Sequence, residues 1–545
     1  MKYGSYTLAA ASALLLASAP SVTASGNNFT RRCGRLITTF KNANTTVLYS
    51  GYVTKGTQID YPDADPTCQN SIVAQADMCR LRLNVTTSST SNVVMEVWMP
   101  VDWKDKGQRF AMTGNGGVSG CISFGDLAYT TALGFATVGH NNGHDGTDSL
   151  PFLGKPEVVK DFAYRALQVA TTVGKTATNY FYQTDLNKSY YWGCSGAGRQ
   201  GMKAAQDFPE EYDGIIAGDP ASEFHRVVAG GLSYWYHMGA PTSQSYLTLE
   251  QWMAVDAEVL AQCDELDGVK DKVLEDPLQC HPRFEAMLCG AGETWAANKC
   301  LTAPQVDGVK KIYSPVYGNK GRYVYPAVQP GNDQVFGYYL VYGAPSDIAT
   351  HYLKYGFYND ANWQLPATLE EFLPVIDDLL DTDVFGVSAN KPDLRKLKAT
   401  GHKLMVYHGM SDGFYTHEST INQYENTARN MTMHSSQLDE FYRLFLISGM
   451  NHCANGNGAW YIGGAGQTDV GVTGVDPNNS LLMQMVRWVE DGIAPETVKG
   501  YQIGSGGSPS GAVREHCKHP YKNKYKGSGD ANDSSNWECK LATGY

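Results

Sequence analysis

The sequence predicts an α/β fold, in which helices cover a largely parallel sheet. Short apolar runs of strand length alternate with helical patterns in two parts of the chain, from about 93 to 218 and again from 402 to 491. At 545 residues the chain is long enough for one large domain with an insertion, or for two to three ordinary domains.

The first part gives its elements in a clear order. Residues 93–99 (VVMEVWM), 109–113 (RFAMT) and the run GFATVGH are expected to be strands. Residues 156–181 form a helix in this prediction, because apolar residues recur at steps of three and four. The strand SYYWG, the helix RQGMKAAQDFP and the strand YDGIIAGDPA follow. Strands that alternate with helices in this way are expected to pair in parallel.

Between about 223 and 398 the alternation stops. This segment is rich in Tyr, Trp and Pro and holds four clustered Cys, which predicts an inserted lid domain. The pattern returns with a strand at 402–409, a helix at 417–431, a strand at 441–449 and an amphipathic helix near 480–491. The α/β domain is therefore expected to comprise 25–222 and 399–545, with an irregular Gly/Ser/Lys-rich tail from 503 onward.

The N-terminus predicts a secreted protein. MKYGSYTLAAASALLLASAPSVTASG has a Lys, an apolar stretch from Leu8 to Ala17 and then small residues, as in a signal peptide over 1–24 that is cut within 19–25. The alternative is a buried N-terminal helix. The apolar stretch is too short to span a membrane, and no later stretch reaches eighteen apolar residues.

Cysteine and asparagine patterns fit the same compartment. The 12 Cys are an even number without C-x-x-C spacing, which favours disulfides over a zinc site. Glycosylation sequons occur at seven asparagines: Asn28, Asn44, Asn84, Asn187, Asn430, Asn478 and Asn532. The formal net charge of −12 and the lack of a long Lys/Arg run argue against nucleic acid or an anionic membrane as a partner.

Ser195 has the sequence context of a nucleophile. In an α/β-hydrolase fold the nucleophile lies on a sharp turn between a strand and a helix, flanked by small residues. The segment 190–201 (YYWGCSGAGRQG) offers that context, but its pentapeptide departs from G-x-S-x-G at Ala197. The alternative is a tight turn with a non-catalytic serine.

An acid and a histidine follow in the order that this fold requires. Asp412 in LMVYHGMSDG and His452 in LFLISGMNHCANG each follow an apolar strand. A serine hydroxyl needs a base to accept its proton, and the base needs an acid to orient it and to stabilise its cation. Each residue alone would be interpreted as an ordinary loop residue, whereas together they predict a Ser195–His452–Asp412 triad.

Two further features accompany the triad. Cys194 precedes the serine and Cys453 follows the histidine, so a disulfide between them is plausible if the triad forms. The alternatives are two unrelated thiols, or pairing of each with another cysteine. An oxyanion hole would need the backbone N–H of Gly196 and one from the run GNGG, from Gly116 or Gly117, unless that run is a plain turn. His144 in NNGHDG either lines the cleft or caps a strand, and the structural interpretation is favoured.

The motifs GCSGAGR, HGMSD and NHC resemble the CS-D-HC arrangement of the fungal tannase and feruloyl esterase family of secreted serine esterases, above all its feruloyl esterase B members. The resemblance covers about 33 to 540. The chain has C-S-G-A-G-R where the family usually has C-S-x-G-G-R, which puts the local turn geometry in question. The resemblance implies six disulfides: Cys194–Cys453, Cys263–Cys280, Cys33–Cys79, Cys68–Cys121, Cys289–Cys300 and Cys517–Cys539.

An acidic loop in the lid suggests a cation site. CDELDGVKDKVLEDP (263–277) holds clustered carboxylates, which repel one another unless a hard cation joins them. Its spacing is not that of an EF-hand, and a solvated acidic loop is the alternative. The resemblance implies a structural calcium ion far from the ester, held by three side chains and two carbonyls: Asp264, Asp267, Asp271, Val269 and Val273.

The expected function is hydrolysis of phenolic-acid esters through an acyl-enzyme. The resemblance implies feruloyl or cinnamoyl esters of plant cell-wall polysaccharide, or a small phenolic ester, as the substrate, and galloyl esters, as in a tannase, as the alternative. Tyrosines of the lid could stack on a phenolic ring. A serine carboxypeptidase, or a secreted carbohydrate-binding protein with a dead site, are the other classes that the sequence leaves open.

Overall fold

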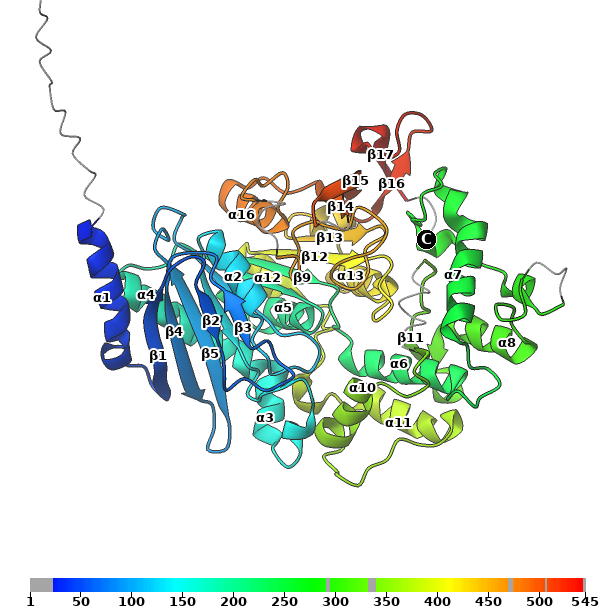
Figure 1. Ribbon diagram of the computed structural model, residues 1–545, viewed down its shortest axis with the longest axis horizontal. Helices are drawn as coiled ribbons and strands as arrows, with labels where there is room; N and C mark the ends of the chain where they lie inside the picture. Colours follow the sequence, from blue (N-terminus) through cyan, green and yellow to red (C-terminus); the bar gives the residue numbers. More distant parts are fainter. Residues whose placement is uncertain (1–22, 291–294, 332–339, 469–473, 505–506, 543–545) are drawn as a thin grey trace, which may run out of the picture.

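A nine-stranded mixed sheet forms the centre of the protein (Figure 1). The computed structural model describes residues 23–290, 295–331, 340–468, 474–504 and 507–542, so nearly all of the expected leader lies outside the described residues. In spatial order the strands are β1 (Thr45–Val53), β4 (Met78–Thr86), β5 (Asn92–Pro100), β7 (Ala136–His140), β6 (Arg109–Thr113), β8 (Lys188–Cys194), β9 (Gly214–Gly218), β12 (Lys403–Gly409) and β13 (Tyr442–Ile447).

The six strands from β7 to β13 run parallel, which confirms the predicted α/β class. The remaining three are antiparallel, including the pairing of β5 with β7, so the strand at 93–99 lies outside the parallel part of the sheet. A hairpin turns β4 back along β5, and a hairpin return reverses strand direction, whereas a helical crossover preserves it.

Helices cover both faces of the sheet. The apolar cluster on one face takes side chains from α1 (Thr23–Thr39), α4 (Ala166–Tyr182), α5 (Gly196–Asp207), α12 (Arg395–Thr400) and α13 (His417–Met431). The cluster on the other takes them from α2 (Phe124–Ala132) and α16 (Leu481–Asp491). The helix expected at 156–181 is present as α3 (Pro156–Lys160), a π-helical turn at Asp161–Arg165 and α4.

The segment 223–398, on the right of Figure 1, forms most of a second apolar core beside the sheet. Residues before it, such as Val159 and Phe162, complete this core. None of its described strands joins the nine-stranded sheet. It contains α6 (Phe224–Met238), α7 (Leu249–Cys263), α8 (Ala303–Ile312), α10 (Asp347–His351), α11 (Leu369–Asp381) and the hairpin of β10 (Val316–Tyr317) and β11 (Tyr323–Tyr325). Capping boxes begin α7 and α8, where Thr248 and Thr302 accept backbone N–H groups.

One face of α5 holds the chain as it returns from this lid. Arg199, Lys203 and Gln206 donate to carbonyl oxygens of residues 387–389, over 2.8, 2.6 and 2.8 Å. All three side chains are almost fully buried. Since a buried donor that loses its partner costs about 1–3 kcal/mol, these contacts fix the lid relative to the helix that follows Ser195.

The C-terminal region is regular, so the expected irregular tail was wrong. It contains β14 (Thr497–Ile503), β15 (Pro509–Cys517), β16 (Tyr521–Tyr525) and β17 (Trp537–Leu541), paired as two antiparallel hairpins. A further two-stranded pair, β2 (Gln58–Asp60) with β3 (Ser71–Val73), lies near the N-terminus. The Cys517–Cys539 disulfide joins β15 to β17, and Arg514 lies over the Trp537 ring. These long-range contacts hold strands whose composition resembles that of a loop.

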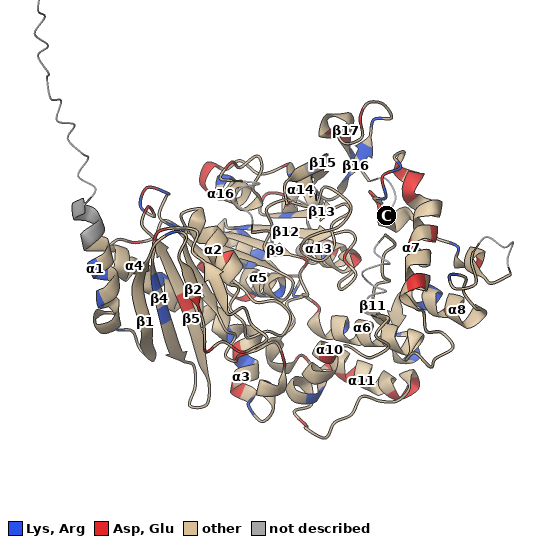
Figure 2. Cartoon of the chain, viewed as in Figure 1, with Lys and Arg blue, Asp and Glu red and all other residues tan. Residues whose placement is uncertain are grey.

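All 12 Cys form six disulfides, in the pairing that the resemblance implies. Six of the seven sequon asparagines are exposed, whereas Asn84 is half-buried in β4. Among the described helices, none combines the length and the apolar character needed to cross a bilayer. Lys and Arg are interspersed with Asp and Glu over the described part in the view of Figure 2.

Candidate active site

Ser195 lies on a sharp turn between β8 and α5. Its backbone has φ +67° and ψ −124°, a conformation that costs a non-glycine residue about 1–3 kcal/mol. The Ser195 N–H donates to the Gly218 carbonyl at 2.9 Å, and its carbonyl accepts the Arg199 N–H at 2.9 Å. The turn is therefore held by hydrogen bonds to the adjacent strand and to its own helix, and it presents the hydroxyl at the carboxyl end of β8.

Ala197 fits this turn because glycines lie opposite it. A Cβ on Gly193 or on Gly114 would lie 2.6 Å from the Ala197 methyl, which no real pair of carbons tolerates. The close approach of helix and strand that usually requires glycine at position 197 occurs instead at Gly198, where a Cβ would clash with the Gly218 carbonyl. The departure from G-x-S-x-G thus leaves the geometry of the turn intact.

The three predicted residues form a hydrogen-bonded chain. The His452 Nε2 lies 2.8 Å from the Ser195 Oγ, and the His452 Nδ1 lies 2.7 Å from the Asp412 Oδ2. The other carboxylate oxygen, Oδ1, accepts the N–H groups of Phe414 at 2.7 Å and Tyr415 at 3.0 Å. Since β8, β12 and β13 are parallel, the loops after them meet at one edge of the sheet.

The electrostatics of this chain suit a general base. Burial by itself raises the pKa of Asp412, but the charge and hydrogen bond of His452, together with those of His408, bring that pKa well below its usual range. For His452, burial lowers the pKa, and the charge and hydrogen bond of Asp412 outweigh it, so the pKa lies above 6.5. Asp412 therefore stays ionised and orients an imidazole of increased basicity.

Of the two candidate glycines for the second oxyanion donor, Gly117 lies against the nucleophile turn. A Cβ on Gly196 would lie 2.6 Å from the Gly117 carbonyl oxygen and 2.7 Å from the Gly117 nitrogen, and no atom of Gly116 is among its three nearest neighbours. Gly117 has φ +54°, which glycine adopts freely. Gly196 is the first residue of α5, so its amide belongs to the N-terminus of a helix, which favours negative charge.

Three residues at this site were missed from the sequence. Asp219 is fully buried and accepts the N–H of Cys453 at 2.8 Å, beside the Cys194–Cys453 disulfide. It directly follows an apolar strand, which is the signal that selected Asp412. The rings of Phe414 and Tyr415 lie 5.0 and 4.9 Å from the His452 ring, and Phe414 is 40% exposed. These two rings give one side of the site an aromatic surface.

His144 is placed in the core. It is 6% exposed, its Nε2 lies 2.9 Å from the Val118 carbonyl oxygen, and its ring lies 4.9 Å from that of Phe152. These contacts agree with the structural interpretation of the NNGHDG segment.

The acidic loop of the lid holds the expected calcium ligands. The carboxylates of Asp264, Asp267 and Asp271 each accept backbone N–H groups of the loop itself, at 2.7 to 3.1 Å, and Cys263–Cys280 closes it. In the described part of the chain, the groups of three acidic, His or Cys side chains with ligand atoms within 4.8 Å of one another lie at the Ser195 site. The three loop carboxylates are therefore spaced more widely than that.

Burial nevertheless disfavours the charged form of two carboxylates in the loop. Burial raises the pKa of Asp267 to about 6, and the charges of Asp271 and Asp264 add to the effect. Burial likewise raises the pKa of Glu275 to about 7, although Arg514 lies 3.6 Å away. Carboxylate and carbonyl oxygens are the donor types that calcium binds, so the chemistry of the loop suits such an ion.

Comparison with known proteins agrees with this site. A family model described as tannase and feruloyl esterase matches residues 79–342 and 375–540. The chain belongs to the tannase and feruloyl esterase family. Members of this family are carboxylic ester hydrolases, which is the enzyme class expected from the motifs.

Relatives match over almost the whole chain. A probable feruloyl esterase B from Aspergillus clavatus is 41% identical, with 96% of this chain and 98% of the relative covered. Feruloyl esterase C from Talaromyces stipitatus is 40% identical, with coverages of 95% and 96%. The crystal structure of feruloyl esterase B from Aspergillus oryzae superposes with a TM-score of 0.89 at 39% identity, over 94% of this chain and all of that one. Tannin acyl hydrolase from Aspergillus niger shares the fold, with a TM-score of 0.72.

Proposed function

We propose that the protein is a secreted serine esterase that hydrolyses feruloyl and related hydroxycinnamoyl esters of plant cell-wall polysaccharide. The observation that carries the proposal is the hydrogen-bonded chain from the Ser195 hydroxyl through His452 to the buried, ionised Asp412. The names of the relatives support the acyl group: feruloyl esterases B and C are about 40% identical over nearly the full chain.

Acylation follows from the position of each group. His452 Nε2 takes the proton of the Ser195 hydroxyl as the oxygen attacks the ester carbonyl. The negative charge that develops on the carbonyl oxygen is stabilised by the backbone N–H groups of Gly196 and Gly117. The imidazolium then gives its proton to the departing alcohol oxygen, and the acyl group remains on Ser195. Asp412 stabilises the imidazolium while it exists.

Deacylation repeats the sequence with water in place of the serine. His452 removes a proton from a water molecule that attacks the acyl carbonyl, and then returns a proton to Ser195 as the carboxylic acid leaves. The exposed ring of Phe414, next to His452, offers a surface on which an aromatic acyl group can stack. A phenolic acid is therefore a suitable acyl group for this site.

Secretion and calcium binding belong to the same proposal. The leader sequence, six disulfides and exposed sequons are those of a protein folded in an oxidising compartment. We place a structural calcium ion at the side chains of Asp264, Asp267 and Asp271 and the carbonyls of Val269 and Val273. Its role would be to neutralise the buried carboxylates of the loop.

Rates on four methyl esters test the substrate class. Methyl ferulate, methyl caffeate, methyl p-coumarate and methyl gallate should be compared side by side with purified protein. The expected result is turnover of the hydroxycinnamates in preference to the gallate. Activity on the gallate alone would overturn the feruloyl assignment and establish a tannase, and hydrolysis of a blocked peptide without ester hydrolysis would establish a peptidase.

A further inference from the structure

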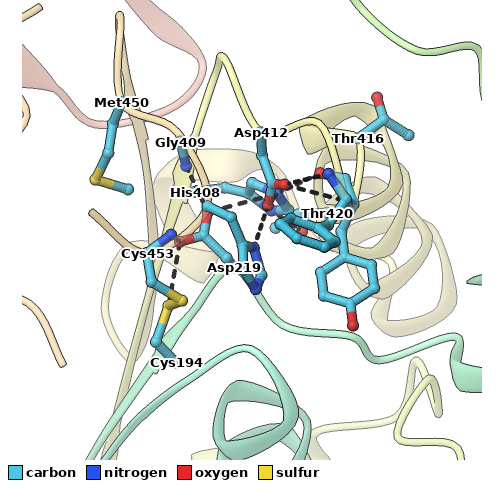
Figure 3. Close-up of polar contacts among 12 residues, drawn as sticks. Cys194, Asp219, His408, Gly409, Asp412, Thr416, Thr420, Met450 and Cys453 are labelled. Carbon is cyan, nitrogen blue, oxygen red and sulfur yellow. Dashed lines mark hydrogen bonds and ion pairs between the residues drawn. A yellow bond between two sulfur atoms is a disulfide. The ribbon is translucent and has the colours of Figure 1, made fainter. Parts of the chain in front are cut away.

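Asp219 is a buried carboxylate that the proposed reaction does not use (Figure 3). It follows β9, the strand between β8 and β12, and has φ +35°. Its Oδ1 accepts the Gly409 N–H at 2.6 Å, and its Oδ2 accepts the Cys453 N–H at 2.8 Å. Its own N–H donates to the Tyr407 carbonyl at 2.8 Å. The Asp219 carboxylate therefore connects the carboxyl ends of β9, β12 and β13. The loops after β12 and β13 carry the candidate acid, Asp412, and the candidate base, His452.

His408 lies between this carboxylate and the one in the triad (Figure 3). Its Nε2 is 3.5 Å from the Asp219 Oδ1 and 3.3 Å from the Asp412 Oδ2, and all three side chains are fully buried. The Nε2 also lies 2.9 Å from the Tyr415 carbonyl oxygen, and the Nδ1 lies 2.7 Å from the Thr420 hydroxyl. The Thr420 hydroxyl can donate or accept, whereas the neighbours of Nε2 only accept, and two of them are carboxylates. Burial lowers the pKa of His408, but the charge of Asp219 and the charge and hydrogen bond of Asp412 outweigh it, so the protonated ring is favoured.

The other titratable groups that face this cluster are neutral near pH 7. Burial, together with the charge of the neighbouring His408, lowers the pKa of His417, on α13, to about 3. Burial raises the pKa of Tyr415 to about 12 and that of Tyr407 well above its usual value. The charges that raise the pKa of His452 are those of Asp412 and Asp219, and His408 lies against both carboxylates. Burial raises the pKa of Asp219 to about 6, so its carboxylate is ionised above that pH.

We propose that Asp219 and His408 are positioning residues of the esterase. Asp219 holds the loops of Asp412 and His452 together. A protonated His408 offsets part of the negative charge of the two carboxylates, so that His452 loses its proton at a lower pH than it would without His408. The inference rests on the proposed function, because it assigns these residues to the same triad. Neither side chain touches the substrate in this account. Their effect on the reaction passes through the position of the Asp412 and His452 loops and through the basicity of His452.

The pH dependence of kcat/KM tests the charge balance. The reaction needs neutral His452, so the rate falls as the pH drops through the pKa of that group. His408→Gln removes a positive neighbour and should move this acid limb upward by about one pH unit. Asp219→Asn removes a negative neighbour and should move it downward, with a fall in kcat because an amide oxygen cannot replace both carboxylate contacts. The rate of inactivation by phenylmethanesulfonyl fluoride should show the same two shifts without an ester substrate.

His516→Gln is the matched control. His516 is as buried as His408, its Nε2 lies 2.8 Å from the Ala459 carbonyl oxygen, and its charged neighbour is Arg514 rather than a carboxylate. The same substitution there should leave the acid limb where it is. Thermal unfolding shows which variants fold, and if His408→Gln does not, the downward shift in Asp219→Asn decides the matter.

Opposite shifts in the two variants support the proposal, because a general loss of structure would lower the rate without moving the limbs in opposite directions. If the variants that fold keep the acid limb of the wild type and Ser195→Ala is inactive, this proposal is overturned and the proposed function stands. Activity that survives Ser195→Ala would instead overturn the proposed function.

Discussion

The Ser195 site and the lid are cross-linked in different ways. The disulfide at the site, Cys194–Cys453, joins residues 259 positions apart in the chain. Two disulfides of the lid, Cys263–Cys280 and Cys289–Cys300, join residues 17 and 11 positions apart. A long-range bond sets the distance between two loops that meet only in the folded protein, whereas a short-range bond shapes a single loop. Loss of the first should therefore appear in the reaction as well as in stability, because stabilisation grows with the length of the closed loop, whereas loss of the second should appear in stability alone.

The largest effect is expected when the nucleophile is removed. Ser195→Ala should lower kcat on phenolic esters by about 10⁴- to 10⁶-fold, because the hydroxyl is the group that attacks. The melting temperature should stay near that of the wild type, since the backbone contacts of the turn are retained. Rate assays and a melting curve on the same preparation check both statements. Near-wild-type turnover of the variant would show that the serine takes no part in the reaction.

The next largest effects are expected when the disulfide at the site or one disulfide of the lid is removed. Replacing Cys194 and Cys453 together by Ser should lower kcat/KM by up to about 100-fold, because small displacements of a nucleophile and its base are costly. Replacing Cys289 and Cys300 together by Ser should cost about 3 kcal/mol of folding free energy, with kcat/KM changed by less than about threefold. Kinetics and denaturant unfolding of the two double variants provide the measurement. Equal losses of activity would remove the distinction between the regions.

The acid limb of the pH profile gives a smaller, graded effect. Since Asp412 raises the pKa of His452 above 6.5, and the reaction needs the deprotonated ring, kcat/KM should fall about tenfold per pH unit below a midpoint that itself lies above pH 6.5. A rate profile between pH 4 and 9, on enzyme that remains folded throughout, locates the midpoint. A midpoint well below 6.5 would mean that the carboxylate does not act on the base.

The smallest effect on turnover is expected from the lid cation. A calcium chelator should lower the melting temperature by a few °C, because the ion binds only the folded loop, while kcat at 25 °C changes by less than about twofold. Metal analysis of the purified protein should find calcium.

Asp267→Asn should abolish the effect of the chelator on the melting temperature. Asp307→Asn, at an exposed carboxylate paired with Lys311 on α8, should retain it. Protein that contains no calcium, or a chelator effect that survives Asp267→Asn, would rule out the site.

The sequence predicted those features that depend on local pattern. Ser195, Asp412 and His452 could be selected because each follows an apolar run, and parallel strands bring such positions to one edge of a sheet. The fit of Ala197 could not be predicted, since it depends on Gly114, which lies some eighty residues earlier in the chain. The residues of the site could therefore be predicted from the sequence. The geometry of the turn could not, because it depends on contacts with residues far away in the chain.

Features that depend on distant pairing were missed or wrong. β1 is an edge strand with a half-exposed pattern, and its pairing with β4 has no local signal. The tail resembles a loop in composition, yet the Cys517–Cys539 disulfide and antiparallel pairing make it regular. Asp219 follows a strand as Asp412 does, but its contacts exist only once β9 lies between β8 and β12.

The central claim is that Ser195 carries the acyl group during turnover. The most direct measurement is to mix the enzyme with an activated feruloyl ester, quench in acid within the first turnovers, and map the peptides by mass spectrometry. The account predicts a feruloyl group on the peptide that contains Ser195 and none in Ser195→Ala. Rapid turnover with no adduct on that peptide, or an adduct on a different residue, would contradict it.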